Sequence, residues 1–185
     1  MARLVGQKEV VQAWLYDAVT LEPDPAEHSS ATFFQVPLGQ AGKTQYDTNL
    51  ETSAQLPGVN ALTITAMLVK IEDLHHPEDF QKILSGYMGL VIGQKVYPDW
   101  APIWLYQGGP SYRVAVGAAT QDIGPWALGG DASIRNVLKF SRAFYISIRP
   151  GETFRVEMHW PSPIKLTQKV KVWVMLFGLR ERAVQ

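Results

Sequence analysis

Two stretches of the chain decide its fold: ETFRVEMHW at residues 152–160 and VKVWVMLF at residues 170–177. In the first, apolar and polar side chains alternate without a break, which is the period of a β-strand with one buried and one solvated face. In the second, one face is apolar throughout, and Trp173, Met175 and Phe177 make the second half of the other face apolar as well. A strand that is apolar on both faces must be covered twice, once by its own core and once by something else.

The rest of the chain carries many strand patterns and few helical ones. Alternation or short apolar runs predict strands over residues 10–20, 32–36, 62–71, 89–96, 103–106, 112–116 and 144–148. Pro77 and the acidic residues after it predict a short helix that ends near Gly86, and Asp131 is a candidate cap for a second helix. The polar, turn-rich connection over residues 38–57 is long enough to contact a partner. About eight strands without βαβ alternation predict an all-β fold, a single jelly-roll barrel or sandwich domain over residues 1–185.

The composition limits the classes of function. Lys plus Arg and Asp plus Glu both number 17, and there is no basic run, so we expect no nucleic-acid partner. Charged residues make up only 18% of the chain, against roughly 25% in soluble domains, which suggests that part of the surface is covered in the working state. The absence of cysteine excludes disulfides and thiol catalysis, and agrees weakly with a hot environment. No apolar run has signal-peptide or membrane-spanning length, so we expect synthesis in the cytoplasm.

Signals for catalysis and for metal binding are weak. The adjacent pair His75-His76 lies among acidic residues, but neighbours on a strand point in opposite directions and zinc ligands usually lie further apart. A cupin-type site needs a His-x-His pair, which the sequence lacks. His159 lies beside Glu157 on the polar face of a predicted strand, where exposed strand polarity explains it. We therefore predict no catalytic residue, no metal and no cofactor.

Three tryptophans lie in Pro-rich or Gly-rich segments: Trp100, Trp104 and Trp126. Loop tryptophans on a β-sandwich can form a platform for sugar rings, because the indole has an apolar body and a polar edge. They can equally anchor a protein interface, where tryptophan is enriched among the residues that carry most of the binding energy. They can also simply fill the mouth of the barrel. The sequence leaves these three uses open.

Several runs of residues resemble a known family of structural proteins. The runs are FFQVP at 33–37, TNLE at 48–51, LP at 56–57, IRPGETF at 148–154 and HWP at 159–161, followed by a last apolar strand. Together they resemble the small major capsid protein of tailless, icosahedral phages with an internal membrane that infect Thermus. The resemblance covers nearly the whole chain, and its motifs are structural rather than catalytic.

The resemblance implies a single vertical jelly-roll barrel in the capsid of a virion. It implies a larger major capsid protein as partner, proximity to the internal membrane, and a homodimer in which strands are exchanged. The sequence meets these expectations at the first and last strands, where apolar side chains need a second covering layer. We predict an interface formed by Trp14, Tyr16, Trp173, Met175 and Phe177.

Two other classes of function remain as alternatives to a coat protein. The first is a carbohydrate-binding β-sandwich module that uses Trp100, Trp104 and Trp126 as its platform. The second, less favoured, is an enzyme of the cupin or isomerase type, which would require a bound metal. The three interpretations differ in a simple observable, because a coat protein forms stable oligomers whereas the binding module is expected to be a monomer.

Overall fold

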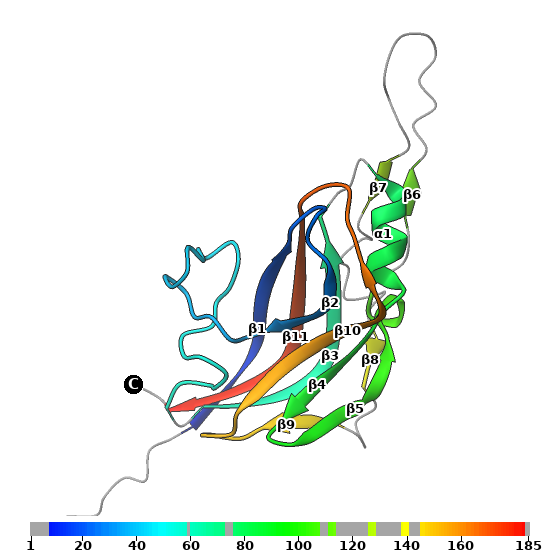
Figure 1. The fold of residues 1–185 in the computed structure, drawn as a ribbon. Helices are drawn as coiled ribbons and strands as arrows, with labels where there is room; N and C mark the ends of the chain where they lie inside the picture. Colours follow the sequence, from blue (N-terminus) through cyan, green and yellow to red (C-terminus); the bar gives the residue numbers. More distant parts are fainter. Residues whose placement is uncertain are drawn as a thin grey trace, which may run out of the picture.

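The computed structural model describes residues 8–58, 60–72, 76–107, 111–113, 126–128, 138–140 and 145–183. Two antiparallel sheets pack face to face (Figure 1). In the first sheet the strand order is β1-β11-β3, and two short strands, β8 and β9, share the remaining edge of β3. The strands of this sheet are β1 (Lys8–Leu21), β3 (Ala61–Ile71), β8 (Leu138–Lys139), β9 (Ile146–Ile148) and β11 (Val170–Ala183).

The second sheet has the strand order β2-β10-β4-β5. Its strands are β2 (His28–Phe33), β4 (Tyr87–Ile92), β5 (Lys95–Pro102) and β10 (Phe154–Ile164). When β8 and β9 are taken as one interrupted edge strand, each sheet has four strands.

The path of the chain between the sheets is that of a jelly roll. β1, β3, β9 and β11 lie in the first sheet and β2, β4, β5 and β10 in the second, so most connections cross from one sheet to the other. The first strand pairs with the last, β1 with β11, and the second with the next to last, β2 with β10. This winding is the jelly-roll arrangement. The predicted all-β fold class is confirmed.

The core lies between the two sheets and is filled by the residues that the alternation selects. Phe154, Val156 and Met158 of β10 are exposed by 1% or less. The even-numbered residues of β11 point to the same core, from Val170 to Leu176. In β10 and in the first half of β11, the period of two in the sequence thus places every second side chain in the core.

The helix α1 (Pro77–Leu84) follows β3 and has acidic residues in its first turn. Asp79 is fully buried, and its carboxylate accepts hydrogen bonds from the backbone N–H groups of Thr167 and Gln168 and from Lys82 Nζ. Burial opposes ionisation, but these hydrogen bonds outweigh it and hold the pKa of Asp79 below its ordinary value. Asp79 thus ties α1 to the connection between β10 and β11.

Three local predictions are wrong. The second strand covers residues 28–33 rather than 32–36, because Phe34 has φ of 67° and gives its N–H to Asp17 Oδ2 at 2.6 Å. The predicted strand over residues 89–96 is two strands, separated by a turn in which Gly93 has φ of 59°. Residues 103–106 form a 3-10 turn, η1 (Ile103–Tyr106), instead of a strand.

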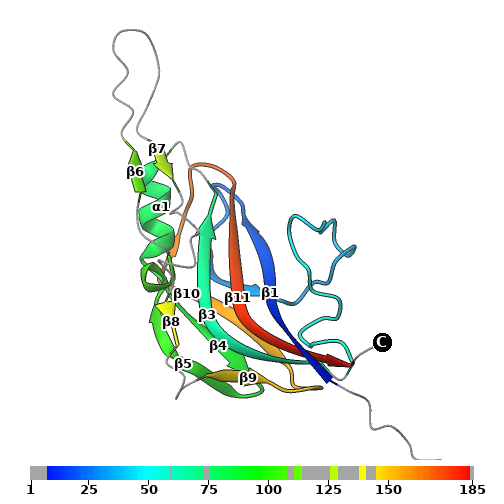
Figure 2. The same ribbon diagram turned by 180° about the vertical axis from the view of Figure 1, so that it is seen from behind.

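The connection between β5 and β9 carries a short hairpin of β6 (Ser111–Arg113) and β7 (Trp126–Leu128). The hairpin lies beside α1 in both ribbon views (Figures 1 and 2). The predicted strand residues 114–116 and the helix expected after Asp131 lie outside the described residues. Within the described part of the chain, no helix is long and apolar enough to cross a membrane.

Candidate functional site

The five residues predicted for an interface all lie on one face of the first sheet, the face that points away from the core. The register of β1 and β11 sets Trp14 opposite Phe177 and Tyr16 opposite Met175, and Trp173 follows on the same face. The rings of Trp14 and Phe177 are in contact, with centroids 4.4 Å apart. Residues that lie far apart in the sequence therefore form one outer apolar surface.

Part of this surface is covered by the chain itself. The excursion loop, residues 38–57, folds back beside β1 in both ribbon views (Figures 1 and 2). Its Tyr46 packs edge-on against Trp173 with 5.5 Å between ring centroids, and Trp173 Nε1 donates to the Tyr46 carbonyl at 3.2 Å. Trp173 is consequently only 5% exposed. The second covering layer that the last strand requires is thus partly intramolecular.

An ion pair fastens the same loop to β11. Lys171 Nζ lies 2.7 Å from Asp47 Oδ1 and 5.4 Å from the ring centroid of Tyr46. The hydrogen bond from Lys171, supported by the backbone N–H of Thr44, lowers the pKa of Asp47 to about 2. Asp47 is therefore ionised at neutral pH and holds Tyr46 over Trp173.

The excursion loop also closes part of the free edge of β1. The side chain of Asn49 mimics a peptide unit: Oδ1 accepts the N–H of Tyr16 at 2.9 Å and Nδ2 donates to the carbonyl of Trp14 at 2.7 Å. Because alternate residues of a strand present their peptide groups to the same edge, those of Val10 and Gln12 point the same way. Within the described residues these groups have no hydrogen-bond partner. The edge of β1 is open there.

An apolar strip remains exposed beside this open edge. We define it as Val10, Trp14, Phe177 and Leu179, all on the outer face of β1 and β11, where the exposed Gln12 lies opposite Leu179. Val10 is 59% exposed, Leu179 43% and Trp14 40%. A groove of about 260 Å³ continues the strip towards the loop, lined by Tyr16, Gln45, Tyr46, Lys70, Trp173 and Met175.

The three tryptophans of the predicted sugar platform come from three different elements. Trp100 belongs to β5, Trp104 to η1 and Trp126 to β7. Trp104 is 58% exposed. It makes no ring contact with Trp100 within the described residues, and the side chain of Trp126 lies outside them. What the fold does bring to Trp100 is another set of side chains.

That set forms a cluster on the outer face of the second sheet, which we call the aromatic–carboxylate cluster: Tyr87, Trp100, Arg155, Glu157 and His159. Sequence reasoning assigned His159 to ordinary strand polarity and did not connect it with Trp100. The cluster depends on the pairing of β4 with β10, which no local pattern encodes. The neighbouring Glu157 and His159 of one strand were the only available signal.

The acidic and histidine residues near α1 do not form a metal site in the described structure. No group of His, Asp and Glu suited to holding a metal ion occurs among the described residues. His75 lies outside them, His76 is exposed, and Asp79 is engaged by Thr167, Gln168 and Lys82. Asp79 therefore has a structural role.

Comparison of the chain with protein-family models, with curated proteins and with solved structures finds no match.

Proposed function

We propose that this chain is a structural coat protein. It assembles with copies of itself and with a larger major capsid protein into an icosahedral shell around an internal membrane. Synthesised in the host cytoplasm, it ends in the virion capsid, as in the phages of Thermus that the sequence resembles. Its residues perform no chemistry in this role, and its function lies in its surfaces.

The observation that carries the proposal is the apolar strip. Val10, Trp14 and Leu179 are large apolar side chains exposed by 40% or more on a strand pair of a jelly roll, a fold used by viral coats. Aromatic residues are enriched at protein interfaces, and contiguous exposed apolar surface marks interaction sites. A shell made of many copies buries such a strip in every subunit.

The open edge of β1 supports the same proposal. Natural proteins usually protect a free strand edge with lysine, proline or a covering segment, because unpaired peptide groups recruit another strand. Asn49 covers the edge at Trp14 and Tyr16 only. The groups of Val10 and Gln12 are left to pair with a strand of a second subunit, which agrees with a homodimer that exchanges or shares strands.

The first test is the solution mass of the purified chain by light scattering, at micromolar concentration and at low and high salt. We expect a dimer at both. Trp14→Asp and Val10→Lys should each shift the mass to that of the monomer, because they place a charge in the strip. Trp104→Asp is the matched control, since Trp104 is exposed but lies on η1, outside the strip. A monomeric unaltered chain would count against the proposal.

The second test concerns the larger partner. Co-expression of the chain with the larger capsid protein should yield mixed capsomers that purify together and are visible by negative-stain microscopy. Trp14→Asp should reduce the yield of capsomers and leave the far-ultraviolet circular dichroism spectrum of the isolated chain unchanged. If capsomers form equally well from the variant, the strip is not required for assembly with the larger protein.

A further inference from the structure

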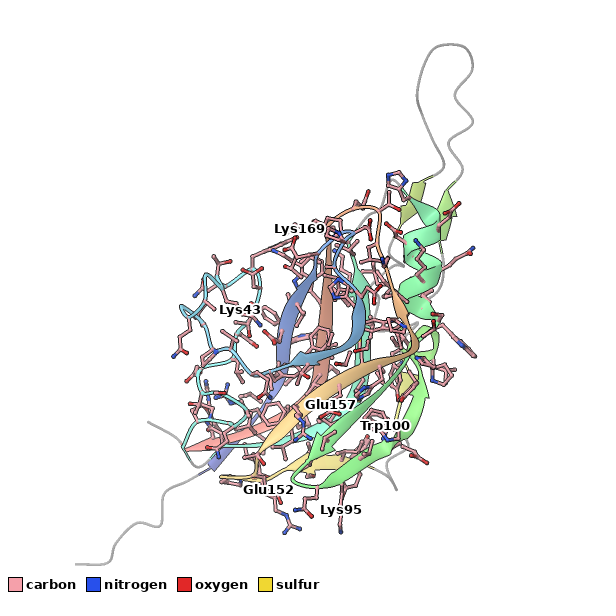
Figure 3. The ribbon with its side chains drawn as sticks, in the orientation of Figure 1. Lys43, Lys95, Trp100, Glu152, Glu157 and Lys169 are labelled. Atoms are coloured by element: carbon pink, nitrogen blue, oxygen red, sulfur yellow. The ribbon has the colours of Figure 1, made fainter. Side chains whose placement is uncertain are left out.

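The aromatic–carboxylate cluster is built by three strands of the second sheet. The pairing of β4 with β10 places Tyr87 opposite His159 and Gly89 opposite Glu157. Trp100 reaches the same face from β5, at the place where the register between β4 and β5 shifts. Figure 3 shows Trp100 and Glu157 on the outside of this sheet, away from the excursion loop that carries Lys43.

The three rings of the cluster are arranged as a stacked pair and a third ring perpendicular to it. Tyr87 and His159 stack on each other, with centroids 5.5 Å apart and an interplanar angle of 27°. Both stand nearly perpendicular to Trp100, at 84° and 79° respectively. The six-membered ring of Trp100 lies over Gly89, where a Cβ would come within 3.0 Å of it. The absence of a side chain at Gly89 makes room for the indole.

The carboxylate of Glu157 lies beside the ring of His159. Glu157 Oε2 is 3.0 Å from His159 Nε2, and Oε1 is paired with Arg155 Nε. Partial burial opposes ionisation of this carboxyl, but the hydrogen bonds from Arg155 and His159 outweigh it and lower the pKa of Glu157. A carboxylate has about four lone-pair sites and a guanidinium has five N–H donors, so both retain capacity for further hydrogen bonds.

The cluster is fixed but not covered. Trp100 is held by Tyr87, His159 and the backbone at Gly89, yet it remains 39% exposed. The side chain of Arg155 is also 39% exposed and that of His159 32%. Side chains that are already ordered lose little conformational entropy when a ligand binds, which favours binding.

We propose that the aromatic–carboxylate cluster is a saccharide-binding site. A pyranose ring presents an apolar face of C–H groups, which packs on the exposed part of Trp100. Its hydroxyl groups donate to Glu157 and accept from Arg155, so the mixed donor and acceptor pair matches a polyol. This site differs from the platform predicted from the sequence, because only Trp100 is common to both, and it is independent of the apolar strip on the opposite sheet.

The chemistry favours a saccharide over other classes of ligand. A phosphate-bearing ligand would meet the ionised Glu157 at the centre of the cluster. A nucleic acid would require a basic surface, whereas the chain has zero net charge. The experiment also distinguishes a saccharide site from a second protein interface at the aromatic–carboxylate cluster.

The test is a titration of the full chain with maltotriose, cellotriose and chitotriose, in which binding is measured by calorimetry and by tryptophan fluorescence. We expect at least one of these probes to bind with a Kd on the order of 1 mM or tighter. Trp100→Ala should weaken that binding about tenfold or more, and Glu157→Gln about fivefold. Trp104→Ala is the matched control and should change the Kd by less than about twofold.

Several results would overturn the proposal. One is the absence of binding by all three probes at concentrations on the order of 10 mM. Another is retained binding in Trp100→Ala, which would place the site away from the cluster. Loss of binding in Trp104→Ala as well as in Trp100→Ala would move the site to the predicted platform. A third is a fall in oligomer mass for Trp100→Ala without saccharide binding by the unaltered chain, which would make the cluster a protein interface. Circular dichroism of each variant verifies that it is folded.

Discussion

Replacement of Trp173 or Trp14 by alanine should separate folding from assembly, although both residues lie on the same outer face. Trp173 is 5% exposed beneath Tyr46, so its truncation removes a buried indole and the hydrogen bond to the Tyr46 carbonyl. We expect Trp173→Ala to lower the free energy of unfolding by about 3 kcal/mol, the lower end for a buried tryptophan, because the loop above it can partly collapse. Trp14 is 40% exposed, so Trp14→Ala should cost the subunit only about 1 kcal/mol.

The assay is equilibrium unfolding in urea, followed by far-ultraviolet circular dichroism at two protein concentrations. Two concentrations are needed because an interface makes the unfolding midpoint depend on concentration. We expect Trp173→Ala to lower the midpoint at both concentrations and to keep the oligomer. Trp14→Ala should remove the concentration dependence instead. Equal losses of unfolding free energy for the two variants would refute the argument that Tyr46 makes Trp173 part of the subunit's own core.

Three further predictions concern the subunit itself. Gly178→Ala should lower the free energy of unfolding in urea by about 3 kcal/mol, because the new Cβ would lie 1.9 Å from the Thr63 carbonyl oxygen, a backbone atom that cannot move aside. Gly93→Ala is the control, because open space surrounds Gly93, and it should cost only about 1 kcal/mol. Equal costs for the two variants would contradict the clash. Asp79→Ala should lower the free energy of unfolding by about 2 kcal/mol, since it leaves the backbone N–H groups of Thr167 and Gln168 without their acceptor and removes the ion-pair partner of Lys82. An unchanged melting temperature would show that α1 is not held this way. Because the folded-state pKa of Asp47 is depressed, the stability from its pair with Lys171 is fully present above pH 3.8 and is lost as the pH falls towards about 2. The melting temperature of Asp47→Asn should lack this pH dependence. If the melting temperatures of the variant and of the unaltered chain change with pH in parallel, that would count against the ion pair.

The local alternation of residues was sufficient to predict the long strands. It selected β10 and β11 and identified the faces that enter the core, because successive side chains of a strand point to opposite faces of the sheet. It could not predict that the strand at Phe33 ends early. That end depends on Asp17, whose buried carboxylate accepts a hydrogen bond from the N–H of Phe34, 17 residues later in the chain.

The candidate surfaces were predicted only in part. The apolar second face of β11 was visible in the sequence, and so was the need to cover it. That Tyr46 covers Trp173 was not predictable, because a long polar loop can fold over either sheet and carries no periodic signal of where it lies. The aromatic–carboxylate cluster was missed for a similar reason. Trp100 and His159 are brought together by a strand register and by the bare surface at Gly89.

The sequence by itself therefore determined the class of fold, the core-facing side chains of β10 and β11, and the excess of apolar surface on the last strand. Each of these follows from the order of neighbouring side chains along one strand. Only the tertiary structure decided which apolar residues are covered by the chain itself and which stay exposed. Those outcomes depend on pairings such as Trp14 with Phe177, between residues at opposite ends of the chain, and such contacts are fixed by the winding of the sheets rather than by local pattern.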